Sequence, residues 1–167
     1  MMINFINILR PHHWVKNLLI FIPMLVAHQI NDLTLINSIL AFISFSLIAS
    51  SGYILNDFID INADKFHPVK KKRSLASGKI TKPQSILLIV LTSLLAILIS
   101  TKVNLNFTFV IAIYFLIVII YSIYLKKIII LDIIVLSCFY TIRIYAGSEA
   151  TEIFISVWLF MFSIFFF

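Results

Sequence analysis

The chain has 167 residues, of which 62% are hydrophobic and only 12% are charged. A soluble domain of average composition is about 25% charged, so this chain has too little polar surface to cover an aqueous globule. Its single cysteine, Cys138, cannot close an internal disulfide, and the apolar composition excludes a disordered chain. The composition therefore predicts an integral membrane protein.

Polar interruptions divide the chain into six apolar segments, each near the length of helix that crosses a bilayer core of about 30 Å. The predicted spans are residues 17–30, kinked at Pro23, then 35–55, 85–100, 107–125, 128–146 and a sixth that begins near Ile153. The sixth span runs to Phe165, Phe166 and Phe167 without a polar flank, so we expect the natural chain to continue further. The predicted fold class is all-α, a polytopic transmembrane helix bundle.

The net charge is +6, and most of the positive residues lie in alternate loops. Positive residues lie near the N-terminus, in the loop after the second span and at Lys126 and Lys127. By the positive-inside rule, we expect a multi-pass protein of the cell inner membrane with the N-terminus and the second loop in the cytoplasm. The residues before Arg10 carry no charge, which argues against a cleaved signal peptide. We expect membrane lipids, and no nucleic acid, as partners.

Three carboxylates directly follow the second span, at Asp57, Asp60 and Asp64, with Asn56 before them. If the helix continues, 100° per residue places the three carboxylates on one face within about 60° of each other. Such a stripe repels itself unless a cation neutralises it, and carboxylate oxygens are ligands that Mg²⁺ prefers and shares with substrate phosphates. The sequence predicts a Mg²⁺ site at these three residues. The alternative is a solvated helix end with ordinary interfacial acids.

A basic stretch follows the acids and includes Lys65, the run 70–72 and Arg73. Beside a metal-binding stripe, these cations would share the charge of a diphosphate group. The alternative is a loop whose charge only sets the membrane topology or contacts anionic lipid.

Ionisable residues also occur within the fifth span, at Asp132 and Arg143. They are eleven residues apart and share a helix face, and such groups usually line a bundle interior or a polar cavity. Arg143 is a candidate anion contact and Asp132 its partner or a partner of the loop cations. A structural ion pair is the alternative. Tyr121 and Lys126 close the fourth span, where an aromatic belt and topology charges also explain them.

The motif Asn-Asp-x-x-Asp-x-x-x-Asp at the end of the second span resembles that of the UbiA superfamily of intramembrane prenyltransferases, and Asn56, Asp57, Asp60 and Asp64 match it fully. Arg73 and the pair 77–78 fit the Arg-Pro-x-x-Ser-Gly element that follows in that family, with serine in place of the proline.

A narrower resemblance is carried by residues 9–17, 121–126, 131–132 and 143–147. These segments are similar to the branch that contains decaprenyl-phosphate phosphoribosyltransferases and UbiA-like domains fused to a haloacid-dehalogenase-type phosphatase domain. The resemblance implies about nine helices around a cavity open to lipid, with a Mg²⁺-bound diphosphate between two Asp-rich motifs. Residues 1–167 would then form a single UbiA-like transmembrane domain holding the first motif and two-thirds or less of the bundle.

The resemblance implies a Mg²⁺-dependent transferase that moves phosphoribosyl from phosphoribosyl diphosphate to a polyprenyl phosphate. The alternatives are prenyl transfer from a polyprenyl diphosphate to an aromatic acceptor, and a non-catalytic lipid-phosphate-binding protein or inactive fragment. A homo-oligomer is compatible with each. The implied catalytic residues are Asp57, Asp60, Asp64 and Lys126, and the implied substrate-binding residues are Lys16, Asn17, Asn56, Lys65, Arg73, Tyr121, Asp132 and Arg143.

Overall fold

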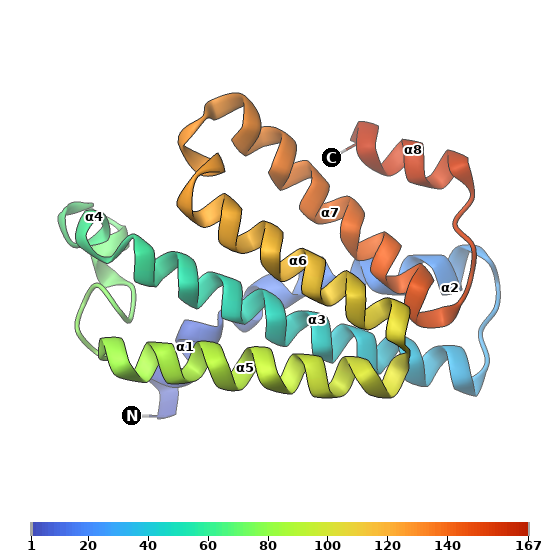
Figure 1. Ribbon diagram of the computed structural model, residues 1–167, viewed down its shortest axis with the longest axis horizontal. Helices are drawn as coiled ribbons and strands as arrows, with labels where there is room; N and C mark the ends of the chain where they lie inside the picture. Colours follow the sequence, from blue (N-terminus) through green and yellow to red (C-terminus); the bar gives the residue numbers. More distant parts are fainter. Residues whose placement is uncertain (1, 167) are drawn as a thin grey trace.

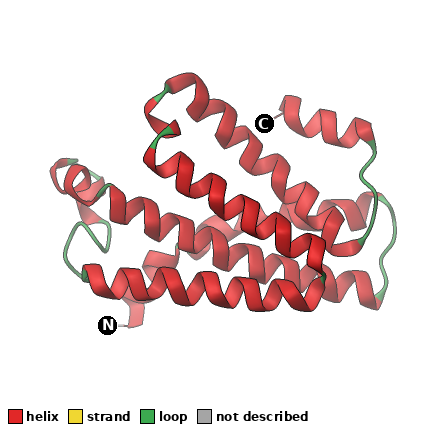
Figure 2. Cartoon of the chain, viewed as in Figure 1, coloured by secondary structure: helices red, strands yellow, loops and turns green. Residues whose placement is uncertain are grey.

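The computed structural model describes residues 2–166, with side chains for residues 5–165, as helices joined by short loops (Figures 1 and 2). No strand occurs in this described range, which confirms the all-α fold class. The elements, with 3-10 helices written η, are α1 (Met2–Leu9), η1 (Pro11–Phe21), α2 (Ile22–Val26), α3 (Asp32–Ile59), α4 (Ile61–Phe66), η2 (Lys70–Lys72), α5 (Lys82–Val103), α6 (Leu105–Ile123), η3 (Leu125–Lys127), α7 (Ile129–Thr151) and α8 (Val157–Phe166).

Four helices in the described range, α3, α5, α6 and α7, are long and apolar enough to cross a membrane, and they correspond to the second to fifth predicted spans. The first predicted span has a different extent. It forms a 3-10 helix from Pro11 and changes to an α-helix at Ile22, beside Pro23, because a proline is favoured at the start of a helix. The sixth predicted span, expected from near Ile153, contains the ten-residue helix α8, which begins at Val157, and Phe167 lies outside the described residues.

Helix α3 runs through the middle of the bundle with α5 beside it and α6 and α7 across it (Figure 1). Small polar side chains make this close packing possible, since they let helix backbones approach each other. Ser44 Oγ donates a hydrogen bond to the Ala96 carbonyl oxygen at 2.7 Å, which joins α3 to α5. The other buried serines of α3 are Ser38, Ser46, Ser50 and Ser51.

Two glycines mark the closest helix crossings. A Cβ atom at Gly147 of α7 would overlap the backbone carbonyl of Ile20 in η1, and one at Gly52 of α3 would lie 2.7 Å from Val118 Cγ1 in α6. These contacts bring η1, α3, α6 and α7 around a common interior.

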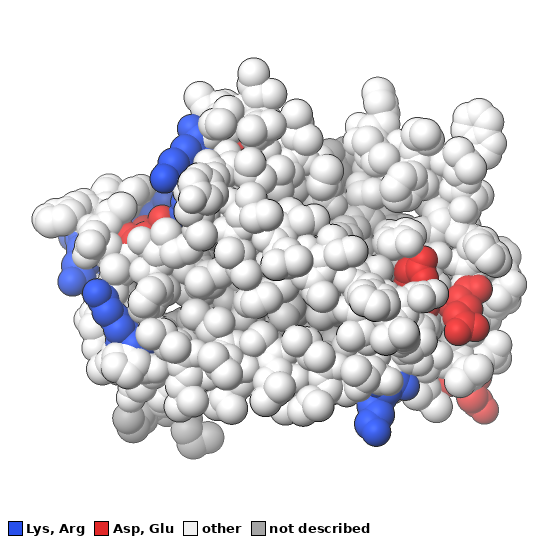
Figure 3. Space-filling view, in the orientation of Figure 1, with Lys and Arg blue, Asp and Glu red and all other residues white. Residues whose placement is uncertain are grey.

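Charged side chains lie at the two ends of the bundle's long axis. In Figure 3, most Lys and Arg atoms gather at the end that carries α4, where some acidic atoms also show, and the other Asp and Glu atoms lie at the opposite end together with one cationic group. The surface between them is uncharged, and exposed apolar side chains such as Leu87, Val90 and Leu94 cover the outer face of α5. This distribution is typical of a bundle that crosses a bilayer.

Candidate functional site

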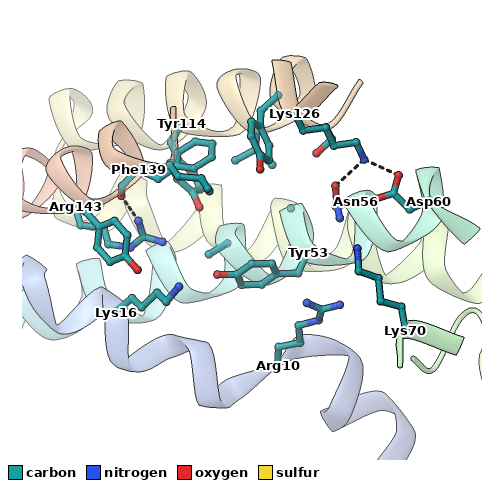
Figure 4. Close-up of a pocket in the computed structure, with 17 residues that line it drawn as sticks. Arg10, Lys16, Tyr53, Asn56, Asp60, Lys70, Tyr114, Lys126, Phe139 and Arg143 are labelled. Atoms are coloured by element: carbon teal, nitrogen blue, oxygen red, sulfur yellow. Dashed lines mark hydrogen bonds and ion pairs between the residues drawn. The ribbon is translucent and has the colours of Figure 1, made fainter. Parts of the chain in front are cut away.

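A cavity of about 330 Å³ lies between η1, α3, α6 and α7 (Figure 4). Five cationic side chains line it, against a single carboxylate among the residues that the structure describes. The cations are Arg10, Lys16, Lys70, Lys126 and Arg143, the carboxylate is Asp60, and aromatic rings of Tyr53, Tyr114, Tyr121, Phe139 and Tyr140 form much of the remaining wall. We call this space the cationic cavity, and its charge favours an anionic ligand.

One end of the cationic cavity, which we call the mouth, is formed by Asn56, Asp60 and Lys126. Lys126 Nζ donates hydrogen bonds to Asp60 Oδ1 at 2.6 Å and to Asn56 Oδ1 at 3.1 Å (Figure 4). Two oxygens from the end of α3 therefore converge on one cation. The Asp60 and Lys126 side chains are 26% and 20% exposed, so a ligand can reach them.

The three Asp residues do not lie on one continuous helix face, which corrects the geometry expected from their spacing. Helix α3 ends at Ile59 and α4 begins at Ile61, with Asp60 at the junction with φ −87° and ψ 3°. Because of this break, Asp60 faces the cationic cavity while Asp57 and Asp64 lie elsewhere. No three His, Cys, Asp or Glu side chains gather as a metal-binding group in the described part of the chain.

Asp57 and Asp64 are both 3% exposed and belong to a network with two arginines. Arg10 Nη2 lies 2.7 Å from both Asp57 carboxylate oxygens, and Arg73 Nη1 bridges Asp57 at 3.1 Å and Asp64 at 2.7 Å. Two negative and two positive groups thus balance one another. The network fastens the basic loop and the start of η1 to the end of α3. Arg10, Asp57 and Arg73 also line a second cavity of about 290 Å³.

Arg10 is a site residue that sequence reasoning missed. It joins α1 to η1 in the left-handed backbone region, with φ 52° and ψ 57°, and its side chain lines both cavities. A residue other than glycine held in such a conformation costs about 1–3 kcal/mol and is frequent at functional sites. In the sequence, Arg10 lies in the family-like segment 9–17, but a positive residue at this place is also explained by membrane topology.

Arg143 lies at the opposite end of the cationic cavity, which we call the inner end, and is 3% exposed. Arg143 Nε donates to Asn17 Oδ1 at 2.8 Å, and another nitrogen of the guanidinium donates to the Phe139 carbonyl. Asn17 Nδ2 in turn donates to Ser46 Oγ at 2.9 Å. The predicted substrate-binding residue Asn17 therefore lies behind Arg143 and orients it.

Aromatic rings surround the guanidinium of Arg143, with ring centres 5.3 Å away for Phe45, 5.9 Å for Tyr114 and 5.7 Å for Tyr140. Lys16 Nζ lies 5.3 Å from the centre of the Tyr140 ring, and Lys16 also lines the cavity.

The remaining predicted residues occupy different positions. Tyr121 lines the cavity and donates a hydrogen bond to Asp132 Oδ1 at 2.7 Å, so the partner found for Asp132 is a tyrosine. Lys65 is exposed on α4.

His13 precedes the first predicted span and contacts an aromatic residue of the cavity wall. The centre of its ring lies 5.1 Å from the centre of the Tyr53 ring. Burial, together with the charges of His12, Lys16 and Arg10, lowers the pKa of His13.

Ser122 presents a buried hydroxyl to the cationic cavity. Its side chain is 1% exposed, and Ser122 Oγ has no hydrogen-bond partner among the described residues. An unsatisfied buried hydroxyl costs about 1–3 kcal/mol, so such a group at a cavity wall indicates a place for a polar ligand atom.

The structure is that of a multi-pass helical membrane protein with an internal cationic cavity. The chain belongs to the UbiA prenyltransferase family, whose model matches residues 17–167. It is 34% identical to the decaprenyl-phosphate phosphoribosyltransferase of Mycolicibacterium smegmatis, over 92% of this chain and 50% of that protein. It is 35% identical to the nodulation protein NoeC of Azorhizobium caulinodans, over 86% of this chain and 47% of that protein.

A third relative, the uncharacterized protein y4nM of Sinorhizobium fredii, is 32% identical over 98% of this chain and 32% of its own length. The chain therefore spans from about a third to half the length of these curated relatives. Among solved structures, the fold is similar to that of a UbiA homologue from Archaeoglobus fulgidus bound to GPP and Mg²⁺, with a TM-score of 0.82 and 19% identity. That match covers 97% of this chain and 59% of the other.

Proposed function

We propose that this protein is a Mg²⁺-dependent membrane transferase that moves phosphoribosyl from phosphoribosyl diphosphate to a polyprenyl phosphate. The observation that carries the proposal is the mouth of the cationic cavity, where Asn56, Asp60 and Lys126 converge beside further cations. The similarity to a decaprenyl-phosphate phosphoribosyltransferase supports this choice of donor and acceptor.

The residues at the mouth fit a Mg²⁺ ion. Asn56 Oδ1 and Asp60 Oδ1 already converge on one cation, the Lys126 ammonium. Protein-bound Mg²⁺ usually keeps several waters and needs only one or two carboxylates plus substrate phosphates, so this small donor set is sufficient. Bound there, Mg²⁺ would neutralise the charge of a diphosphate leaving group. Asp57 and Asp64 remain predicted ligands, and their pairs with Arg10 and Arg73 would have to open first.

Lys126 at the mouth and two further cations of the cavity would supply the remaining positive charge for the reaction. The bond between the donor C1 atom and the diphosphate oxygen breaks, and the diphosphate leaves with the electron pair. An oxygen of the acceptor phosphate forms the new bond to C1. Lys126, released from Asp60, together with Arg10 and Lys70, would stabilise the departing oxygens, because preorganised positive groups act strongly where water is excluded.

An apolar groove beside the cavity suits the polyprenyl chain. It has a volume of about 250 Å³, and Phe139 lines both this groove and the cationic cavity. The other lining residues come from α6, α7 and α8 and include Ile117, Ile142, Phe160 and Ile164. A prenyl diphosphate donor with an aromatic acceptor would use the same groove, which keeps that reaction as the second candidate.

We further propose that the protein lies in the inner membrane and that the basic end seen in Figure 3 faces the cytoplasm.

The test is turnover in membranes that contain the protein, with phosphoribosyl diphosphate, a polyprenyl phosphate and Mg²⁺. We expect pyrophosphate release that stops with EDTA and in the Asp60→Asn variant. The control is Asp32→Asn at the opposite end of α3, which should keep full activity. Turnover only with a prenyl diphosphate and an aromatic acceptor would favour the second candidate. Lipid-phosphate binding that is indifferent to Mg²⁺ and to Asp60 would contradict both enzymes.

A further inference from the structure

We infer that the inner end of the cationic cavity is a second anion subsite, which takes a phosphate monoester separate from the diphosphate at the mouth. This inference rests on the proposed function, because that function assigns the diphosphate to Lys126 and Asp60. The residues of the inner subsite are Lys16 and Arg143.

The first observation is the uncompensated charge of Arg143. A guanidinium stays protonated in proteins, and burying a charge is costly unless it is paired. The described partners of Arg143 are neutral, namely Asn17, the Phe139 carbonyl and the surrounding aromatic rings. None of the ion pairs in the described part of the chain includes Arg143. A bound anion would supply the missing negative charge.

The second observation is that Lys16 brings another positive charge to the same end. Figure 4 shows Lys16 and Arg143 together at the end of the cavity opposite Lys126 and Asp60. Asp60 is the one carboxylate lining this cavity in the described structure, and Lys126 already holds it. A purely structural role for Arg143, tying α7 to η1 through Asn17, explains the Asn17 hydrogen bond but not the second positive charge beside it, because the contact that the structure gives Lys16 is the neutral Tyr140 ring.

The third observation is the distance between the two ends. Phe45 contacts Arg143, Asn56 contacts Lys126, and these two residues of α3 are eleven positions apart. Eleven residues of helix rise about 16 Å. The two phosphoryl groups of one diphosphate share a bridging oxygen, so they cannot occupy both ends. The inner anion must therefore be a separate group.

This arrangement also bears on the substrate class. A hydrocarbon tail in the inner end would lie against a buried guanidinium and a lysine, which is unfavourable. A phosphate monoester instead forms charge-assisted hydrogen bonds with both groups. The monoester is carried either by the sugar of the donor or by the lipid acceptor, and the test below separates these sources.

The test is calorimetric titration of the 167-residue chain in detergent with three probes, ribose 5-phosphate, geranyl phosphate and pyrophosphate with Mg²⁺. The variants are Lys16→Gln at the inner end, Lys126→Gln at the mouth and, as the matched control, Lys102→Gln, which is exposed in the last turn of α5. Hydrogen bonds to charged groups contribute about 1.5–3 kcal/mol, so each loss should weaken binding by about tenfold or more.

We expect Lys16→Gln to weaken monoester binding and to spare pyrophosphate, Lys126→Gln to do the reverse, and Lys102→Gln to change neither. Saturable binding of ribose 5-phosphate assigns the inner anion to the sugar, and binding of geranyl phosphate alone assigns it to the lipid. The inference is overturned if neither monoester binds, if Lys16→Gln has no effect, or if monoester and pyrophosphate compete for one site. Mg²⁺-dependent pyrophosphate binding would still support the proposed function in those cases. Loss of pyrophosphate binding alone would instead contradict that function.

Discussion

Lys126 Nζ lies 2.6 Å from Asp60 Oδ1, although 66 residues separate the two in the chain. The pair joins η3 to the end of α3 and places the carboxylate of the cationic cavity beside a cation, whose place Mg²⁺ would take under the proposed function. Asp57 and Asp64, only a few residues away, do not line this cavity and are paired with Arg10 and Arg73. One Asp-rich segment therefore contains two environments, and substitutions within it should have different effects.

Asp57→Asn should destabilise the protein more than Asp60→Asn. Asp57 is buried and contacts two arginines, and removing one partner of a buried ion pair costs about 3–5 kcal/mol. Asp60 is more exposed and contacts a single lysine. Thermal unfolding in detergent, followed by circular dichroism, should show a clearly lower midpoint for Asp57→Asn. Equal midpoints for the two variants would contradict the assigned network.

Arg73→Ala should loosen the basic loop from the membrane helices. Arg73 bridges Asp57 and Asp64, so its loss leaves two buried carboxylates with only Arg10 to balance them. We expect faster proteolysis between α4 and α5 in this variant than in Lys71→Ala, whose side chain is exposed in the same loop. Similar cleavage rates in both would show that the bridge does not hold the loop.

Ser122→Ala should leave the ligand-free protein as stable as the wild type or slightly more stable. The hydroxyl is buried without a partner, so its removal relieves a desolvation cost of about 1–3 kcal/mol. Ligand binding should weaken, because the same hydroxyl faces the cationic cavity. A melting curve and a substrate titration on one preparation measure both effects. A destabilised variant with unchanged affinity would mean that Ser122 serves the fold only.

Gly147→Ala should be far more damaging than Gly52→Ala. The added methyl group at Gly147 would overlap the Ile20 backbone, which cannot move without shifting η1 against α7. At Gly52 the nearest atom is Val118 Cγ1, the end of a side chain. Overpacking typically costs about 1–3 kcal/mol, and we expect Gly147→Ala to reach or exceed the upper value. The unfolding midpoints of both variants in detergent provide the comparison, and the reverse order would refute it.

Much of this fold was predictable from hydropathy, because a membrane span needs a long run of apolar residues whatever its neighbours. The helices α3, α5, α6 and α7 match predicted spans for this reason. The segment from Pro11 to Phe21 was harder to predict, because it packs against α3 and α7 and local hydropathy does not indicate its 3-10 conformation.

At the site, the predicted residues Asn56, Asp60, Lys126 and Arg143 all line one cavity, although they come from separate segments. Spacing alone failed at Asp60, because it assumes a continuous helix and the backbone turns there. Arg10 was missed because its partner, Asp57, lies 47 residues further along the chain. A local charge pattern cannot distinguish a long-range ion pair from a topology signal.

The proposed Mg²⁺-bound diphosphate at the mouth is tested by measuring pyrophosphate binding to this chain with and without Mg²⁺. The proteins compared are the wild type, Asp60→Asn and the control Lys127→Gln, whose side chain is exposed beside Lys126. If the mouth holds a Mg²⁺-bound diphosphate, binding requires Mg²⁺, weakens about tenfold or more in Asp60→Asn and is unchanged in Lys127→Gln. Binding that is equally tight without Mg²⁺, or in Asp60→Asn, would contradict the claim.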